Sequence, residues 1–342
     1  MSTLYLIEQN TVLRKTGDRL LLCKKSHGKS GGPRVDDILL DLPCADVDHV
    51  MLFGNVQVTT QALQEMLQHG IEFAIFTFSG VLLGQLTPPQ TKNIPLRIAQ
   101  FKKHDDADFC LRLAKALVRN KIGNAAEMIR QHRKHHPESI APAEVEALEE
   151  LVSRAENAAS LDNLLGYEGA ATAAYFQLFG RMLLPPWTFT TRTRRPPKDP
   201  VNAVLSFGYV IVGNELQALL DGVGFDPYLG FYHAVEYGRP GLALDLLEEF
   251  RHPLVDRLAL NLFNLGSLTE ADFARESNGG VYLNTAGKKK FSLQYERMLG
   301  ELAGATDPAG KPRGFRALFQ DQVAALMKAM QQNVDYVPFQ MK

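Results

Sequence analysis

The 342-residue chain has few cysteines, one tryptophan and no excess of charge of either sign. Its three cysteines, Cys23, Cys44 and Cys110, are scattered, which excludes a disulfide framework and a cysteine-rich metal site, so we expect reduced thiols. No segment reaches the roughly 18 uncharged apolar residues of a membrane helix. The N-terminus has no basic start followed by a cleavable apolar run. We therefore expect a cytoplasmic protein with no membrane partner.

The balance of charge excludes a globally basic protein. Lys and Arg number 37 against 38 Asp and Glu, of which residues 1–90 hold 7 against 9 and the remainder 30 against 29. The bulk positive charge of many nucleic-acid-binding domains is missing, so any contact with DNA must come from local clusters. A hydrophobic content of 45% is ordinary for a folded protein, and the length favours two domains.

Residues 1–90 are predicted to form a small β-rich domain. A turn at 16–18 predicts a hairpin over 11–24, and Thr59 or Thr60 is expected to cap a helix that ends before Gly70. The Gly- and Ser-rich stretch 26–33 predicts a flexible loop. Short apolar runs typical of strands occur at 4–7, 11–13, 20–22, 38–40, 50–53, 73–76 and 81–83.

After a Pro-containing linker at 87–91, the pattern changes to helical periods. The fold class predicted is therefore an α+β multidomain protein, with a small N-terminal β-rich domain, 1–90, followed by a larger all-α domain, 91–342. The tail 334–342 is expected to be disordered by itself and available to dock on a partner. Helices are predicted over 109–118, 145–159, 167–184, 200–220, 241–265 and 314–331.

The predicted helix from Gly241 carries the most informative cluster of polar residues. On a wheel of about 100° per residue, Asp245, Glu248, Glu249 and His252 share the side opposite the leucines. One interpretation is a solvated acidic face. The other is a site for a hard cation, because paired carboxylates become favourable when a divalent ion lies between them. A di-iron bundle would need a second Glu-x-x-His unit, and no second unit is found.

Two other residues have both a structural and a functional interpretation. Glu168 is placed in the first turn of a Gly- and Ala-rich helix, where an acid interacts favourably with the helix dipole. His233 follows Tyr228-Leu229-Gly230-Phe231-Tyr232, a setting that suits a hydrogen-bonded core histidine, a neutral imidazole ligand or a proton shuttle. Neither residue is a specific signal by itself.

The order and spacing of these residues resemble a known family. A glutamate on a Gly/Ala-rich helix, a histidine after Gly-Phe-Tyr and an Asp-x-x-Glu beyond it are similar to the CRISPR-associated endonuclease-integrases of spacer acquisition. The segments Arg195-Pro196-Pro197, Asp199-Pro200-Val201-Asn202, Leu205–Tyr209, Leu242–Arg251 and Leu52–Thr60 carry the same likeness. It covers most of the chain and includes the β-then-α order.

The resemblance implies that Glu168, His233 and Glu248 are catalytic and coordinate Mg²⁺ or Mn²⁺, with Asp245 as a fourth or an outer-shell ligand. A 3′-hydroxyl of a short DNA fragment would attack a phosphodiester of the CRISPR repeat, a transesterification in which the ion stabilises charge on the phosphate. A repair or recombination nuclease without integration, and a non-catalytic DNA-binding scaffold, remain as alternatives.

Contacts with DNA are expected from two clusters of positive charge. The first lies between the Glu168 helix and the helix from Pro200, and the second near residue 289; a solvated surface is the alternative for both. Their members are Arg192, Arg194, Arg195 and Lys198 in the first, and Lys288, Lys289 and Lys290 in the second.

The resemblance also implies protein partners. The family works as a homodimer and assembles two dimers around a small ferredoxin-like protein, which gives a heterohexamer on a short duplex spacer precursor and the repeat DNA. An edge strand of residues 1–90 is the expected dimer surface, because unpaired strands invite pairing. The family also admits an iron–sulfur exonuclease as a further partner.

Overall fold

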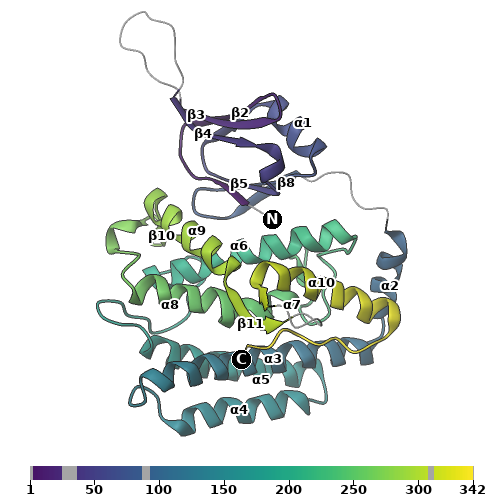
Figure 1. The fold of residues 1–342 in the computed structure, drawn as a ribbon. Helices are drawn as coiled ribbons and strands as arrows, with labels where there is room; N and C mark the ends of the chain where they lie inside the picture. The colour runs from purple at the N-terminus through teal and green to yellow at the C-terminus, as the bar shows by residue number, and fades with distance from the viewer. Residues whose placement is uncertain (1–2, 25–36, 87–92, 307–311, 342) are drawn as a thin grey trace, which may run out of the picture. The chain divides into compact units, whose positions relative to one another are not determined.

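The structure is a computed structural model that describes residues 3–24, 37–86, 93–306 and 312–341 (Figure 1). The chain divides into two compact units, Met1–Gln90 with Leu283–Ser292, and Thr91–Tyr282 with Leu293–Lys342. Residues 283–292 therefore belong to the first unit, whereas the predicted helical domain, 91–342, includes them.

The first unit contains two four-stranded sheets, with strand orders β1-β5-β7-β8 and β4-β3-β2-β6 among the described residues. In the first sheet, β1 and β7 each pair with β5 in parallel, and β8 lies antiparallel at the edge. The elements are β1 (Thr3–Leu6), β2 (Thr11–Thr16), β3 (Arg19–Lys24), β4 (Asp37–Pro43), η1 (Cys44–Asp46), β5 (His49–Phe53), β6 (Val56–Val58), α1 (Thr60–Gln68), β7 (Glu72–Phe76) and β8 (Leu82–Leu86).

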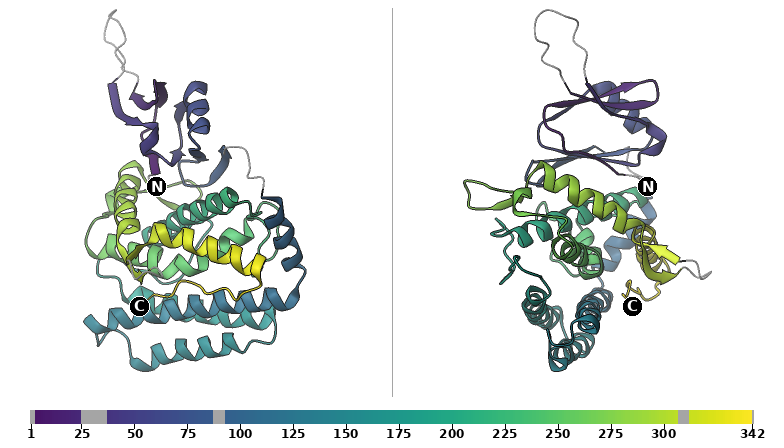
Figure 2. Two further views of the ribbon diagram at one scale, coloured as in Figure 1. Left: turned by 45° about the vertical axis from the view of Figure 1, so that its right-hand side comes forward. Right: turned by 60° about the vertical axis from the view of Figure 1, so that its left-hand side comes forward.

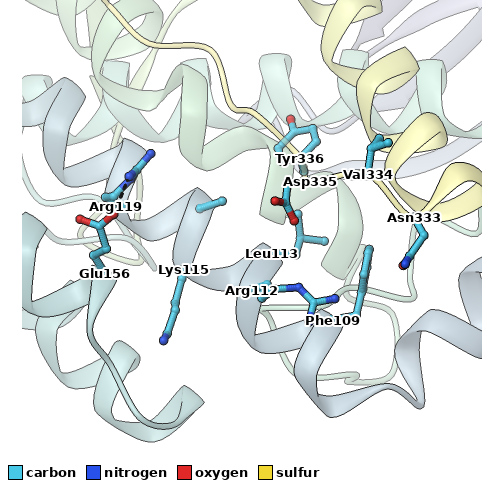
Figure 3. Close-up of a pocket in the computed structure, with 11 residues that line it drawn as sticks. Phe109, Arg112, Leu113, Lys115, Arg119, Glu156, Asn333, Val334, Asp335 and Tyr336 are labelled. Atoms are coloured by element: carbon cyan, nitrogen blue, oxygen red, sulfur yellow. Dashed lines mark hydrogen bonds and ion pairs between the residues drawn. The ribbon is translucent and has the colours of Figure 1, made fainter.

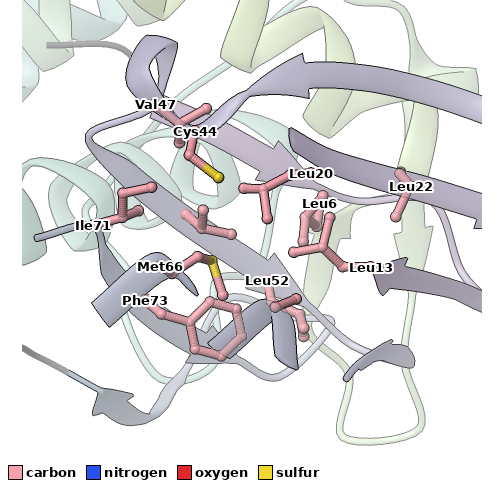
Figure 4. Packing of buried hydrophobic residues seen from close by; sticks show 12 residues of the cluster. Leu6, Leu13, Leu20, Leu22, Cys44, Val47, Leu52, Met66, Ile71 and Phe73 are labelled. Carbon is pink, nitrogen blue, oxygen red and sulfur yellow. The ribbon is translucent and has the colours of Figure 1, made fainter. Parts of the chain in front are cut away.

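Local chemistry explains the turns of this unit. The predicted hairpin is confirmed as β2 and β3, and Gly17 at its turn has a φ of 60°, which glycine adopts without steric cost. Thr59 caps α1 by accepting from the N–H of Ala62. Both sheets and α1 contribute to one hydrophobic core (Figure 4), which includes Leu6, Leu13, Leu20, Leu22, Leu52, Met66 and Phe73.

The second unit is mainly helical, and α3, α4 and α5 pack alongside one another (Figure 1, Figure 2). Two short ribbons, β9–β10 and β11–β12, interrupt the helices, so an all-α region is wrong in that detail. The helices are α2 (Ile94–His104), α3 (Ala107–His135), α4 (Pro142–Glu156), α5 (Leu161–Arg181), α6 (Pro200–Val223), α7 (Gly241–Phe250), α8 (Arg257–Asn264), α9 (Thr285–Gly300, which begins in the first unit) and α10 (Phe315–Gln332). The remaining elements are η2 (Arg251–Asp256), η3 (Glu270–Asp272), β9 (Phe273–Arg275), β10 (Val281–Leu283), β11 (Leu302–Thr306) and β12 (Pro312–Gly314).

Helix α6 runs through the core of the second unit. Asp199 caps it as predicted, and Gly224 ends it with a φ of 103°. It is long and apolar enough to cross a membrane by length and composition, but 72% of that stretch is buried inside the protein. The apolar composition of α6 is therefore explained by its position in the core.

The helix predicted over 241–265 is present but changes geometry midway. α7 ends at Phe250, Arg251–Asp256 form the π-helical segment η2, and α8 continues to Asn264. Pro253 lies inside η2 and has no N–H to donate to the helical ladder. A π turn is wider than an α turn, so residues after Phe250 no longer follow the angular spacing of an α-helical wheel.

Other predictions differ from the structure. α5 begins at Leu161 rather than 167, so Glu168 lies seven residues inside the helix and the predicted dipole interaction, which is limited to the first turn, is wrong for it. α2 and α9 were not predicted. The predicted loop at 26–33 and linker at 87–91 lie outside the described residues. The tail is not disordered, because Tyr336, Phe339 and Met341 are buried.

Candidate metal centre

Three side chains from separate parts of the second unit meet around Lys121 of α3. The Lys121 ammonium contacts Oε1 of Glu168 on α5 and lies 2.6 Å from Oε2 of Glu248 on α7. Nε2 of His233, in the loop before α7, lies 3.7 Å from Oε1 of Glu248. The structure therefore brings together the three residues predicted as metal ligands, although they are far apart in the sequence.

The acidic face of α7 is buried rather than solvated. Asp245, Glu248 and Glu249 expose at most 2% of their surface, and His252 exposes 3%. The interpretation as a solvated face is therefore wrong. A buried carboxylate needs hydrogen-bond donors, a cation or a proton, and these three acids meet that need in different ways.

Asp245 holds the loop that carries His233. Its Oδ2 accepts from the N–H groups of Phe231 at 2.6 Å and Tyr232 at 3.1 Å. Its Oδ1 accepts from the His233 N–H at 2.9 Å and from Nδ1 of the ring at 2.8 Å. With Nδ1 donating to Asp245, Nε2 is left as the acceptor on the side of Glu248. Carboxylates orient metal-binding histidines in this way, so Asp245 suits an outer-shell role rather than direct ligation.

Two cations keep the glutamates ionised. Arg251 Nε lies 2.9 Å from Oε2 of Glu248. Burial raises the pKa of the Glu248 carboxyl, but Arg251 and Lys121 outweigh burial and hold that pKa well below its usual range. Burial also raises the pKa of Glu168, and Lys121 again lowers it overall. Both side chains are therefore carboxylates at neutral pH, the form that binds cations.

One oxygen of the centre lacks a hydrogen bond. Oε2 of Glu248 is buried, and neither Lys121 nor Arg251 meets it with hydrogen-bond geometry. The two cations, at 2.6 Å and 2.9 Å, still compensate the charge of this oxygen. Together with Glu168 and Nε2 of His233, it forms a carboxylate–imidazole donor set that suits Mn²⁺ or Mg²⁺. The chemistry of these donors fits the predicted ion, on the condition that the Lys121 ammonium turns away from between the glutamates and that the ligand atoms of the three residues, which are not all within 4.8 Å of one another, close around the ion.

Glu249 and His252 point to other partners. Glu249 is hydrogen bonded to the hydroxyl of Tyr336, and Nδ1 of His252 lies 2.7 Å from Oδ2 of Asp256. The helical wheel left open whether they share a site with Glu248, and their contacts in the structure are with other partners. Residues spread over an arc of about 100° on a buried helix can face different neighbouring elements, and η2 rotates His252 further.

Asp256 anchors a network that supports Arg251. It accepts from the hydroxyl of Tyr175 at 2.9 Å and from the hydroxyl of Tyr209. The Arg251 guanidinium lies over the Tyr209 ring, 4.6 Å from its centroid, an attractive cation–π geometry. Tyr209 therefore helps to direct Arg251 towards Glu248.

Sequence reasoning missed Lys121 and Arg251. A signal for Lys121 was available, because it continues the series Leu113 and Leu117 at intervals of four and so falls on the buried face of its helix. A lysine there needs a buried partner. Arg251 gave no such signal, because its direction depends on the π-helical segment.

The first predicted DNA-binding cluster is only partly available. The Arg192 guanidinium donates to Asn202 at 2.8 Å and to Ser206 at 3.0 Å, and it lies over the Tyr209 ring. These contacts use the partly exposed guanidinium as internal support, and a contact of Arg192 with DNA stays a prediction. The other three members, Arg194, Arg195 and Lys198, are exposed.

In the second cluster, Lys288 is 1% exposed. Its ammonium donates to the carbonyl of Phe78 and lies 3.3 Å from the centroid of that ring, so the predicted DNA contact is wrong for Lys288. Lys289 is exposed and pairs with Glu8 at 2.6 Å. Lys290 is also exposed.

A second titratable cluster lies in the first unit. Among the described residues, only Cys44, Glu65 and His69 place three potential ligand atoms within 4.8 Å of one another. Glu65 is already paired with Lys15, and burial raises the pKa of the Cys44 thiol, which lies in the hydrophobic core (Figure 4). A buried neutral thiol is a poor ligand, so we assign this cluster to packing and ion pairing.

Known proteins are similar in sequence to this chain over nearly its whole length. An endonuclease named Cas1 from Thermus thermophilus is 37% identical over 338 residues, which cover 98% of each chain. A Cas4 exonuclease/Cas1 endonuclease fusion from Geobacter sulfurreducens is 35% identical over 98% of this chain, which spans only 59% of the fusion.

Solved structures agree with these sequence relatives. A CAS1 protein from Thermotoga maritima superposes with a TM-score of 0.80 over the whole of both chains at 24% identity, which shows a shared fold. A chain of a Cas6-RT-Cas1–Cas2 complex gives the same TM-score at 26% identity, over 99% of this chain and 36% of the other. The family model described as CRISPR associated protein Cas1 matches residues 4–297. The chain therefore belongs to the Cas1 family of CRISPR-associated proteins.

Proposed function

We propose that this chain is a divalent-metal-dependent DNA endonuclease and integrase that inserts short DNA fragments into a CRISPR array. The observation that carries the proposal is the meeting of Glu168, His233 and Glu248 around Lys121, with both glutamates ionised and the ring of His233 held by Asp245. Relatives with more than 30% identity are named as endonucleases. The burial of the cluster favours this function over a scaffold with a merely solvated acidic face.

Each residue of the centre has a separate part in this proposal. Glu168, Glu248 and Nε2 of His233 hold the ion. A bound Mg²⁺ or Mn²⁺ would neutralise charge on the phosphate and favour ionisation of the attacking 3′-hydroxyl. Asp245 accepts a hydrogen bond from Nδ1–H of His233, which orients the ring so that Nε2 faces the place of the ion. Arg251 keeps Glu248 ionised and in place.

DNA is proposed to approach along the segment before α6. Arg194, Arg195 and Lys198 are exposed there, and such side chains bind phosphates without reading sequence. Arg192 supports this segment from inside and contacts Tyr209, which also contacts Arg251. The proposed phosphate-binding segment is thus linked to the proposed metal centre by stacked side chains.

The partners are proposed from the relatives. One solved relative forms part of a complex with Cas2, and two curated relatives are fused to a Cas4 exonuclease. These names support Cas2 and a Cas4 exonuclease as partners, and the family resemblance adds the proposal of a homodimer that joins a small ferredoxin-like partner in a heterohexamer, with an iron–sulfur exonuclease as a further partner. The edge strands β4 and β8 carry exposed apolar residues, Ile38, Leu39 and Leu83, as a strand-pairing surface would.

The experiment that tests the proposal is an integration assay. Supercoiled plasmid with a repeat, a labelled duplex with free 3′-hydroxyls and Mn²⁺ should give covalently joined, nicked product. Glu168→Ala and His233→Ala should each abolish joining, whereas Glu150→Ala and His135→Ala, which change exposed residues, should not. Full joining by both site variants contradicts the metal assignment. Cleavage of branched DNA with no joined donor would instead indicate a repair or recombination nuclease.

A further inference from the structure

The chain after α10 forms a C-terminal strap, residues 333–341, that runs along α3 (Figure 1, Figure 2). The strap contains no regular secondary structure, yet Tyr336, Phe339 and Met341 expose 8% of their surface or less. An irregular segment is buried only where its backbone groups find partners. The hydrogen-bond partners of the strap therefore show which helices it connects.

The first residues of the strap are loosely packed. Asn333–Tyr336 border a pocket of about 260 Å³ whose other wall includes Phe109 and Leu113 of α3 (Figure 3). Packing is incomplete there, so the strap is not anchored along its whole length. Asn333 accepts from Lys103 of α2 at 2.6 Å, and the buried contacts begin at Tyr336.

One anchor is on α7. The hydroxyl of Tyr336 bonds to Oε1 of Glu249, and the N–H of Phe339 donates to Oε2 of Glu249 at 2.7 Å. The Phe339 ring stacks on Phe250, with centroids 5.9 Å apart and planes at 10°. The strap thus contacts Glu249 and Phe250, the two residues that follow Glu248.

The second anchor is on α3. Asn124 donates to the carbonyl of Phe339 at 3.3 Å and accepts from the N–H of Met341 at 2.9 Å. Its amide also donates to the carbonyl of Glu249 at 3.1 Å. Asn124 is fully buried, and it joins α3, α7 and the strap at a single point.

Both anchors lie next to residues of the proposed metal centre. Glu249 follows Glu248 directly, and Asn124 lies three residues, about one helical turn, after Lys121. We propose that Tyr336 and Asn124 are positioning residues, through which the strap fixes α3 and α7 so that Lys121 and Glu248 share one site. Ligand sites require placement within about 0.5 Å, and two anchors on two helices restrain their spacing. This inference rests on the proposed function.

The test measures Mn²⁺ binding to the full-length protein by calorimetry, at a temperature well below unfolding. Tyr336→Phe removes one hydroxyl and should weaken Mn²⁺ affinity about tenfold, the low end for residues behind metal ligands. Tyr237→Phe is the matched control, because Tyr237 is fully exposed. The Mn²⁺ affinity of this variant should equal that of the wild type. Asn124→Ala should act in the same direction and provides a second variant if either one fails to fold.

A merely structural strap makes a different prediction. It would lower the melting temperature of Tyr336→Phe and leave the Mn²⁺ affinity of the folded protein unchanged, which overturns the inference. Combining Tyr336→Phe with Asn124→Ala should give less than the sum of the single effects if both act through the same helix spacing. Absence of Mn²⁺ binding by the wild type overturns the proposed metal centre itself, and this result is distinct from a loss confined to the strap variants.

Discussion

Glu248 and Glu249 are neighbours on helix α7, and their surroundings shift their pKa values in opposite directions. Glu248 faces Lys121 and Arg251, and these cations hold its pKa well below the usual range against the effect of burial. Glu249 faces the strap, where burial raises its pKa to about 8 although Tyr336 and the Phe339 N–H lower it.

The difference teaches that burial alone does not decide the charge of a carboxyl group. Both side chains are at most 2% exposed and are adjacent in the sequence. Cations at contact distance favour the ionised form, whereas neutral donors only partly offset desolvation. One side of α7 is therefore suited to a cation, and the other side to holding a segment of the chain.

The largest contrast is expected between Glu248→Gln and Glu249→Gln. Glu248→Gln removes a ligand charge and should lower the rate of DNA joining by more than about a hundredfold, beyond the range for residues behind the ligands. Glu249→Gln keeps a neutral group that can bond to Tyr336 and should retain Mn²⁺ binding. Rates of joining and calorimetric Mn²⁺ titrations of both variants measure the contrast. Equal losses would mean that the two sides do not differ in function.

Lys121→Met should separate metal binding from stability. Without the ammonium, Glu168 loses its contact with Lys121 and Glu248 keeps only Arg251 as a counter-charge, and breaking a buried pair typically destabilises a protein by about 3–5 kcal/mol. The melting temperature in EDTA should therefore fall. Mn²⁺ should restore it and bind more tightly than to the wild type, because no ammonium has to be displaced.

Lys115→Met, a change on the same helix outside the centre, is the control for Lys121→Met. It should leave both the melting temperature in EDTA and the effect of Mn²⁺ as in the wild type. Weaker Mn²⁺ binding by Lys121→Met would contradict competition between the ammonium and the ion.

Asp245→Asn should have an intermediate effect. An asparagine can keep at most part of the four contacts to Phe231, Tyr232 and His233, so the ring of His233 loses its fixed orientation. Loss of such a partner costs about 10- to 100-fold in metal affinity. Mn²⁺ titration measures this loss, and an affinity equal to that of the wild type would show that Asp245 only supports the loop.

A separate effect, on stability rather than on metal affinity or joining rate, is expected in the pH dependence of the metal-free protein. The pKa of Glu249 is raised from 4.5 to about 8 on folding, so the folded state binds the extra proton between these values. The stabilisation that comes from this proton is fully present below the unfolded pKa of 4.5, and it is lost as the pH rises through the folded pKa of about 8. Melting temperatures in EDTA from pH 5 to 8 should therefore fall more for the wild type than for Glu249→Gln. Parallel curves would contradict the raised pKa.

Much of the fold is predictable from local patterns. Gly17 and the alternating residues around it predict the β2–β3 hairpin, and Thr59, Asp199 and Gly70 mark helix ends that the structure confirms. These features depend on neighbours in sequence, whose geometry is set by backbone sterics and local hydrogen bonds. Burial was harder to predict. The sequence around Lys288 does not distinguish a solvated lysine from one whose ammonium lies over the ring of Phe78.

The sequence by itself determined the order of the β-rich and helical regions, the positions of most turns and caps, and which residues resemble the ligands of a known family. Only the tertiary structure decided that Lys121 lies between Glu168 and Glu248, that Asp245 serves His233, and that Glu249 belongs to the strap. The physical reason is that a helical wheel fixes the angle of a side chain about its own axis. The element that occupies that direction, and hence the charge and role of the side chain, is set by packing between segments far apart in the sequence.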